Sequence, residues 1–285
     1  MILIDSLLTL LVILIIASLV LSTFLTHRHM LRDRRSPAEV GLEFEEVNFA
    51  AADGLALRGW WVPCPGAERT IIQLHGQGGS MDPDIQYLPA WHAAGFNVLM
   101  FDFRAHGRSA GNFSTVGYLE RQDVQGAVRF VLTKGFQRIG LLGFSMGGSV
   151  SMLSAPICPE VMAVVSDGGP TRLTTGLREW CAERHIPRPI GVFLAGLVLC
   201  GVALRLGVNI FRYEPVLWVG QMAPRPILFI HGEHDQYCPD FDELWAAAQP
   251  IKEIWRVSEA GHVSASQQFP EEHRRRVIEF FDKYL

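Results

Sequence analysis

The feature that most constrains the fold is a regular alternation between short apolar runs and longer segments of helical periodicity. Apolar, β-branched and aromatic runs bounded by turn residues predict strands at 42–51, 55–62, 70–75, 97–103, 138–144, 161–167, 226–232 and 252–258. Apolar residues at helical spacing predict helices at 84–94, 118–135, 147–155, 240–249 and 270–285. This alternation predicts an α/β fold, with a mostly parallel sheet covered by helices on both faces.

The N-terminus has a different character, because residues 6–26 contain no charged side chain and only Asp5 carries a side-chain charge before them. At a rise of about 1.5 Å per residue, this stretch forms a helix of about 30 Å, the thickness of the hydrocarbon layer of a membrane. A cleaved signal peptide would need a positive n-region and a small-x-small cleavage site, and neither is evident. A buried core helix of this length without a polar face would be unusual. We therefore predict an uncleaved transmembrane anchor at 1–26, with those two structures as the alternatives.

No Lys or Arg precedes this apolar segment, whereas four arginines follow it closely: Arg28, Arg32, Arg34 and Arg35. The positive-inside rule then predicts a single-pass protein whose remaining chain lies on the cytoplasmic side. Residues 27–40 are predicted to be a basic juxtamembrane linker, which anionic lipid would attract.

A serine stands where a predicted strand meets a predicted helix, in the sequence Gly143-Phe144-Ser145-Met146-Gly147. In such a tight strand-to-helix turn the serine takes a strained backbone conformation, and glycine is needed two positions away on either side. The helix that follows offers free N–H groups and the positive end of its dipole. The alternative is a packing turn without chemistry.

A serine hydroxyl becomes a good nucleophile only when an oriented base removes its proton. Asp235 follows the predicted strand 226–232, and His262 lies in the loop after the predicted strand 252–258. The carboxyl ends of parallel strands share one edge of a sheet, where open α/β sheets bind ligands. We therefore predict a catalytic triad of Ser145, His262 and Asp235.

Other residues compete for these roles. Asp167 also ends a strand and is an alternative acid, and His106 and His234 are alternative bases. His234 directly precedes Asp235, so it cannot easily bridge from that aspartate to the serine.

The glycine-rich segment 74–80 ends another predicted strand, and its Gln77 N–H could face the Met146 N–H across the site. Two such backbone donors are predicted to form an oxyanion hole. We expect His75, Asp102 and Arg104 to brace the loops around the site. Trp60 and Trp61 are expected to be strand residues, one facing in and one facing out.

Residues 170–223 are too long for a simple crossover between strands, and 189–204 contains no charge. A second membrane span is one interpretation. However, Ser145 precedes this stretch while Asp235 and His262 follow it, so a single crossing would place them on opposite sides of the bilayer. We predict instead a helical cap over the site, with 189–204 forming two short helices. Either it is an apolar roof for an acyl chain, or it simply packs as an extra layer.

The chain resembles the α/β-hydrolase superfamily, most closely the membrane-anchored BEM46-like and ABHD-type serine hydrolases. The resemblance covers about 41–285 apart from the cap. It rests on His75-Gly76, the segment 102–109, the serine turn, His231-Gly232 with Asp235 and Pro239, and Gly261-His262. The family usually has glycine where Ala105 stands, at a position that shapes the turn after a strand.

The resemblance implies a hydrolase of esters, thioesters or amides that needs no cofactor. We predict a serine hydrolase for apolar, lipid-like acyl esters or thioesters, whose partners are a small acyl substrate and the lipid bilayer. A serine peptidase or amidase of the same fold and a non-catalytic, membrane-anchored binding protein are the alternatives. The sequence does not indicate an oligomeric state.

Composition and residue spacing bear on three further properties: nucleic-acid binding, metal binding and the state of the cysteines. A net charge of −4 with mixed signs and no basic stripe argues against a nucleic-acid partner. The ten histidines include no H-E-x-x-H pattern, so no metal site is predicted. The five cysteines are widely spaced with no C-x-x-C pair, as expected for reduced thiols in a reducing compartment.

Overall fold

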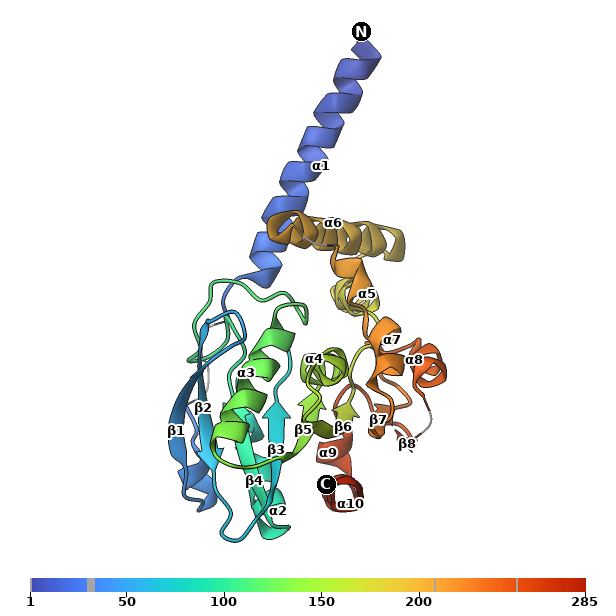
Figure 1. Cartoon of the computed structure of the whole chain (residues 1–285). Helices are drawn as coiled ribbons and strands as arrows, with labels where there is room; N and C mark the ends of the chain where they lie inside the picture. Colours follow the sequence, from blue (N-terminus) through green and yellow to red (C-terminus); the bar gives the residue numbers. More distant parts are fainter. Residues whose placement is uncertain (1, 30–33, 208, 250) are drawn as a thin grey trace.

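A single sheet of eight strands forms the centre of the computed structural model, which describes residues 2–29, 34–207, 209–249 and 251–285 (Figure 1). The strands are β1 (Glu45–Ala50), β2 (Ala56–Val62), β3 (Arg69–Leu74), β4 (Phe96–Phe101), β5 (Arg138–Phe144), β6 (Val161–Asp167), β7 (Ile227–Gly232) and β8 (Lys252–Val257). Their order across the sheet is β1-β2-β4-β3-β5-β6-β7-β8. β2 pairs antiparallel with β1 and β4, and every other neighbouring pair is parallel. The predicted fold class is confirmed.

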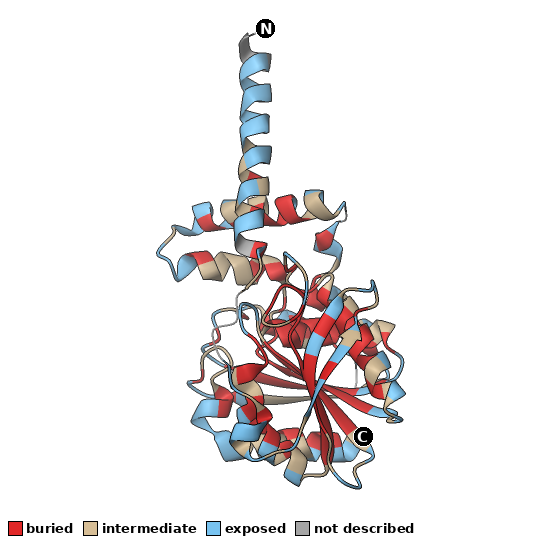
Figure 2. Ribbon diagram, turned by 90° about the vertical axis from the view of Figure 1, so that its left-hand side faces the viewer, coloured by how far each residue is buried: buried red, intermediate tan, exposed pale blue. Residues whose placement is uncertain are grey.

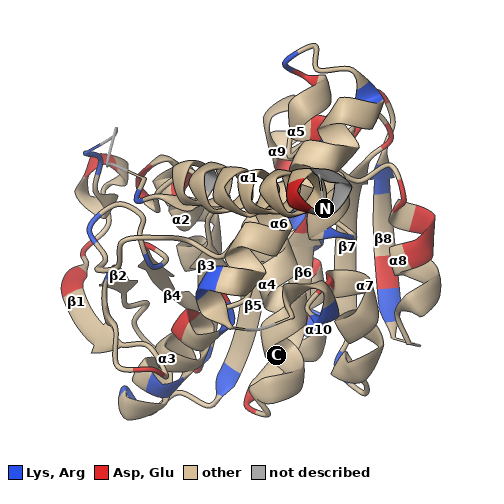
Figure 3. Cartoon of the chain, turned by 90° about the horizontal axis from the view of Figure 1, so that it is seen from above, with Lys and Arg blue, Asp and Glu red and all other residues tan. Residues whose placement is uncertain are grey.

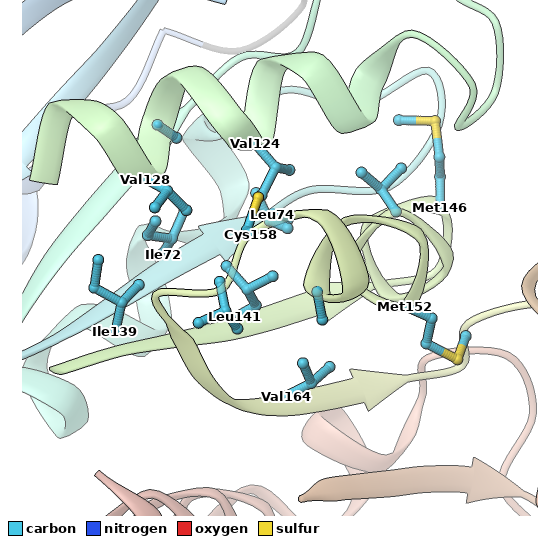
Figure 4. Close-up of a cluster of buried hydrophobic side chains, with 14 of the residues drawn as sticks. Ile72, Leu74, Val124, Val128, Ile139, Leu141, Met146, Met152, Cys158 and Val164 are labelled. Carbon is cyan, nitrogen blue, oxygen red and sulfur yellow. The ribbon is translucent and has the colours of Figure 1, made fainter. Parts of the chain in front are cut away.

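Helices cover both faces of this sheet. One face carries α3 (Glu120–Thr133), α4 (Met146–Ser154) and α8 (Phe241–Ala247), and the other carries α2 (Leu88–Ala93), α9 (Ala265–Gln268) and α10 (Pro270–Tyr284). Figure 4 shows Val124 and Val128 of α3 above Ile72 and Leu141 of the sheet. Strands buried on both faces must be apolar along their whole length, which explains the continuous apolar runs in the sequence.

The two tryptophans of β2 show the consequence of this double coverage. Trp60 and Trp61 do point to opposite faces, but both are buried, in different core clusters. The expectation that one faces outward was wrong, because helices cover both faces of the sheet and each face has its own hydrophobic core.

The helix predicted over 84–94 is in fact two shorter helices. A 3₁₀ helix spans Asp82–Tyr87, and α2 begins at Leu88 with Pro89 in its first turn. Proline has no N–H to donate to the preceding turn, so it favours a new helical start at this point. The other 3₁₀ helices are Pro37–Val40, Ala155–Ile157, Ile210–Arg212 and Val219–Met222.

The N-terminal helix α1 (Ile2–Thr26) leaves the body of the molecule, and most of its upper side chains are exposed (Figure 2). The segment between β6 and β7 forms α5 (Leu173–Ala182), α6 (Arg188–Leu206) and the short α7 (Pro215–Trp218). By length and composition, α1 and α6 are both apolar enough to cross a membrane.

The predicted pair of short helices within 189–204 was wrong, because α6 is continuous over Arg188–Leu206. Two of its glycines mark close approaches to neighbouring helices and do not interrupt α6. A Cβ atom at Gly191 would lie 3.1 Å from the Cys181 Cβ, and one at Gly201 would lie 2.3 Å from the Ser18 carbonyl oxygen.

The segment that follows α1 is docked on the domain. The Arg28 guanidinium donates to the carbonyls of Gly107, Ser109 and Gly111 at 2.7–3.0 Å. The His29 N–H donates to the Ala105 carbonyl at 2.7 Å. Arg28 is therefore engaged by protein carbonyls, whereas Arg32 of the predicted basic linker lies outside the described residues.

Candidate active site

The turn between β5 and α4 holds Ser145 in the strained conformation expected of this motif, with φ 52° and ψ −117°. The flanking glycines are required by space. A Cβ at Gly143 would lie 2.2 Å from the Gly147 backbone, and a Cβ at Gly147 would lie 2.2 Å from the Leu74 carbonyl oxygen. The turn thus presents the hydroxyl at the carboxyl edge of the sheet.

Three residues predicted from distant parts of the sequence meet at this edge. The His262 Nε2 lies 2.8 Å from the Ser145 Oγ, and its Nδ1 lies 2.9 Å and 3.0 Å from the two carboxylate oxygens of Asp235. With Nδ1–H donating to the buried carboxylate, Nε2 is free to accept the serine proton. The Tyr237 N–H also donates to Asp235, at 2.9 Å, and its ring packs against the imidazole.

The alternative residues are held elsewhere. The Asp167 Oδ2 lies 2.9 Å from the His273 Nε2, and both side chains are buried. The His106 Nε2 accepts the Gly78 N–H at 3.2 Å, whereas His234 is exposed. None of these alternative side chains is hydrogen-bonded to the Ser145 hydroxyl, although the Asp167 carbonyl accepts the Ser145 N–H at 2.8 Å.

The two predicted oxyanion donors belong to the loop after β3 and to the start of α4. Gln77 and Met146 line the same pocket as Ser145. Within the described ranges, neither backbone N–H is paired with a backbone carbonyl. The Gln77 side chain is fixed by the Ser114 hydroxyl at 3.2 Å and by the His29 Nε2 at 3.0 Å. Two unpaired donors beside a nucleophile can stabilise negative charge on a substrate oxygen.

Two buried histidines hold the loops that surround this site. The His75 Nε2 accepts the Phe103 N–H at 3.0 Å, while its Nδ1 faces the Gly76 carbonyl at 2.8 Å. His106 makes the corresponding pair of bonds to Gly78 and Arg104. Burial lowers the pKa of each imidazole to about 4, so both rings are neutral at pH 7 and keep Nε2 as an acceptor.

Buried charges brace the same region. The Arg104 guanidinium donates to Asp123 at 2.6 Å and to Asp53 at 2.9 Å. The Asp102 carboxylate accepts the N–H groups of Met81 at 2.9 Å and Arg108 at 2.8 Å. These contacts agree with the structural role expected for Arg104 and Asp102.

Ala105 occupies the position where related proteins usually have glycine. Its φ of 57° lies in the left-handed region, which explains the usual preference for glycine there. The turn nevertheless forms, with the Ala105 N–H donating to the Ala110 carbonyl at 2.8 Å.

A pocket of about 450 Å³ opens above Ser145 and His262. One wall comes from α5 and carries Leu173, Leu177 and Trp180. A second, more open hollow of about 640 Å³, between α2 and α10, contains none of the predicted site residues. Across the described part of the chain, no group of three or more His, Cys, Asp or Glu side chains is arranged to hold a metal ion.

Several pocket residues escaped prediction. Leu173, Leu177 and Trp180 stand at helical i, i+4, i+7 spacing, a pattern that could have indicated an apolar face turned toward the site. Phe24 and His29 also line the pocket, and no local pattern distinguishes them, because their position depends on how the N-terminal segment docks.

Comparison with known proteins agrees with this architecture. A family profile described as the alpha/beta hydrolase fold matches residues 69–183. The chain has the α/β-hydrolase fold. The structure of the Pyrococcus furiosus esterase Pf2001 is similar to this hydrolase with a TM-score of 0.76 and 28% identity, over 91% of this chain and 98% of the esterase.

Two protein sequences are similar to this hydrolase over most of its length. The uncharacterized protein YfhR of Escherichia coli K12 is 28% identical, over 83% of this chain and 80% of YfhR. The protein bem46 of Schizosaccharomyces pombe is 24% identical, over 72% of this chain and 64% of bem46. The family profile and the esterase structure support a hydrolase.

Proposed function

We propose that this α/β-hydrolase is a membrane-anchored serine hydrolase that cleaves apolar acyl esters or thioesters through an acyl-enzyme. The observation that carries the proposal is the continuous hydrogen-bond chain from Ser145 Oγ through His262 to Asp235, with donor–acceptor distances of 2.8–3.0 Å. An oriented imidazole in contact with a strained serine is the arrangement that nucleophilic catalysis requires.

In this mechanism His262 Nε2 takes the proton of the Ser145 hydroxyl while the oxygen attacks the substrate carbonyl carbon. The N–H groups of Gln77 and Met146 donate to the resulting oxyanion. His262 then protonates the departing alcohol or thiol, which leaves the acyl group on the serine. In the second half His262 deprotonates water, and the water oxygen attacks the acyl carbon. The bond between that carbon and Ser145 Oγ then breaks, the carboxylic acid leaves, and His262 returns its proton to the serine oxygen. Asp235 remains ionised and stabilises the imidazolium.

The substrate class is inferred from the pocket. The wall formed by Leu173, Leu177 and Trp180 offers apolar contact for an acyl chain next to the nucleophile. An esterase among the similar structures supports the same class. The runner-up substrates are peptide or other amide bonds.

Labelling with a fluorophosphonate probe tests the nucleophile. We expect the intact protein to be labelled at Ser145 and the Ser145→Ala variant to be unlabelled. An intact, folded protein that does not react would favour a non-catalytic binding protein. A series of p-nitrophenyl esters of rising chain length, compared with peptide amides, then tests the substrate class. Amide turnover that exceeds ester turnover would favour the peptidase.

Anchoring is proposed for α1, and the positive charges that follow it support a catalytic domain on the cytoplasmic side. The exposure of its leucines, such as 60% for Leu7, supports contact with lipid. Carbonate extraction followed by N-terminal sequencing tests this: an anchor stays in the membrane with its first residues intact. A soluble product that lacks α1 would show a signal peptide instead. Protease accessibility in sealed vesicles tests the orientation.

A further inference from the structure

One face of α6 is apolar and uncovered. Ile190, Phe193 and Leu204 are 51%, 52% and 60% exposed, and Cys200 is exposed between them. Their spacing places them along one side of the helix. The only charged residues of α6, Arg188 and Arg205, stand at its two ends, so its central face is tan in Figure 3. Such a stripe on a soluble domain needs a partner or an apolar medium.

The α1 helix fixes where this stripe lies. α6 runs across α1 (Figures 1 and 2) and meets it at Ser18 and Ser22. A Cβ at Gly201 would lie 2.3 Å from the Ser18 carbonyl oxygen and 2.6 Å from the Ser22 Oγ, so the two backbones touch. Close crossings over small residues are typical of helices that associate in lipid.

The hydroxyl groups of α1 near this crossing suit a medium without water. The Ser18 hydroxyl donates to the Leu197 carbonyl of α6. Those of Ser22 and Thr26 donate to carbonyls of α1 at 2.9 Å and 2.6 Å. All three side chains are buried, and each hydroxyl donates a hydrogen bond, which a hydrocarbon environment demands.

The depth of α6 follows from the length of α1. The uncharged stretch 6–26 is about 30 Å long, so its lower end at Thr26 coincides with the lower boundary of the hydrocarbon layer. Ser18 and Ser22 are eight and four residues before Thr26, which places the crossing about 6–12 Å inside that boundary. Phe24, which lines the pocket above Ser145, lies about 3 Å inside it.

We propose that α6 lies within the hydrocarbon layer, along the plane of the membrane, and that the pocket between α5 and the end of α1 opens directly to the bilayer. The substrate is then an amphiphilic acyl ester that resides in the leaflet, because the ester carbonyls of such lipids mark the boundary at which Phe24 lies. Its acyl chain enters the pocket sideways from the membrane. This inference rests on the proposed anchor and the proposed hydrolase, which the experiments below test separately.

The first experiment measures the depth of α6. Cys200 is exposed, so an environment-sensitive NBD group is attached to its thiol. The full-length protein carries Cys64→Ser, so that the half-buried Cys64 is not labelled as well, and it is reconstituted in phosphatidylcholine vesicles. We expect quenching by lipids that carry a nitroxide high on the acyl chain, and little quenching by aqueous iodide. Quenching by iodide alone overturns the proposal. If neither the lipid nitroxides nor iodide quench the label, the proposal is also overturned, because a second copy of the protein would then cover the stripe.

A label on α1 makes this result interpretable. Val12→Cys, combined with Cys200→Ser and Cys64→Ser, places the same group on the exposed upper part of α1. If this label is quenched by lipid nitroxides and the Cys200 label is not, the anchor stands and the in-plane position of α6 is wrong. If neither α1 nor α6 is reached by the lipid quenchers, the anchor itself is wrong.

The second experiment measures access to the pocket. Phe193→Gln combined with Leu204→Gln reduces the apolar stripe without touching the pocket. We expect at least a tenfold loss of turnover of a long-chain ester held in vesicles, and less than a twofold change for a soluble short-chain ester. Met162→Gln is the matched control, since Met162 is 41% exposed at the amino end of β6, far from α6.

Equal effects on both substrates, or no effect on either, would overturn lateral access. If the unaltered protein hydrolyses neither ester while the Cys200 label is quenched by lipid, the proposed chemistry fails and the position of α6 stands.

Discussion

Adding one methyl group at Gly147 tests whether the geometry of the serine turn controls the chemistry. In Gly147→Ala the new Cβ would lie 2.2 Å from the Leu74 carbonyl oxygen and 2.8 Å from its carbon. Real contacts of this kind are not shorter than about 3 Å, so the serine turn and the end of β3 must separate by about 1 Å. Leu74 leads directly into the loop that carries the Gln77 N–H. A displacement of about 1 Å costs about 10²-fold in rate, and loss of one oxyanion donor costs about 10²–10³-fold.

We therefore expect kcat/KM for a p-nitrophenyl ester to fall by about 10²–10³-fold in Gly147→Ala. The fold itself should survive, because overpacking costs about 1–3 kcal/mol against a total stability of about 5–15 kcal/mol. Gly196→Ala is the control, since nothing lies within 4 Å of its Cβ position. Near-UV circular dichroism verifies folding of both variants. Activity of folded Gly147→Ala within threefold of the unaltered protein would refute this account of the turn.

Three further predictions concern the residues around the serine. Asp235→Asn should lower kcat/KM for ester hydrolysis by about 10⁴-fold, because the imidazole loses its orienting carboxylate. Asp167→Asn should lower kcat/KM less than tenfold. If Asp167→Asn has the larger effect, Asp167 is the acid of the triad. Arg104→Met removes the guanidinium that pairs with the buried Asp123. Chemical denaturation in detergent should then show about 3–5 kcal/mol lower stability, and a loss under 1 kcal/mol would be the contrary result. The pKa of His75 is about 4 in the folded protein and about 6.5 in the unfolded chain, so the unfolded chain binds the extra proton between these values and stability falls with falling pH. The difference in free energy of unfolding between the unaltered protein and His75→Gln should therefore fall by about 2 kcal/mol from pH 7.5 to pH 5. A difference that stays the same or rises as the pH is lowered would contradict a buried neutral ring.

The candidate triad was predictable because each member follows its own strand. Parallel strands place their carboxyl ends at one edge, so a serine after β5, an aspartate after β7 and a histidine after β8 must lie near one another whatever the intervening loops do. The same argument made Asp167, which ends β6, an alternative candidate for the acid of the triad. The choice against it depends on His273, a residue of α10 that the local pattern around β6 cannot reveal.

Other features depend on contacts between distant segments. The docking of Arg28 and His29 against residues 105–111 adds part of the pocket wall, yet neither segment carries a pattern that anticipates the other. The Ala105 turn illustrates the same limit. Its φ of 57° disfavours alanine, and the carbonyl it presents accepts the N–H of His29, a contact no periodicity encodes.

The apolar stretch of α6 shows how hydropathy and chain order complement each other. Hydropathy alone cannot distinguish a second span from a helix that lies along the membrane, since both are long and apolar. Chain order can, because Ser145 precedes α6 while Asp235 and His262 follow it, and a single crossing would separate them. The observed hydrogen bonds among the three require both ends of α6 to remain on the side of the catalytic domain. The crossing at Gly201 and Ser18 satisfies both constraints, because it lets an apolar helix approach α1, the proposed anchor, closely without running alongside it.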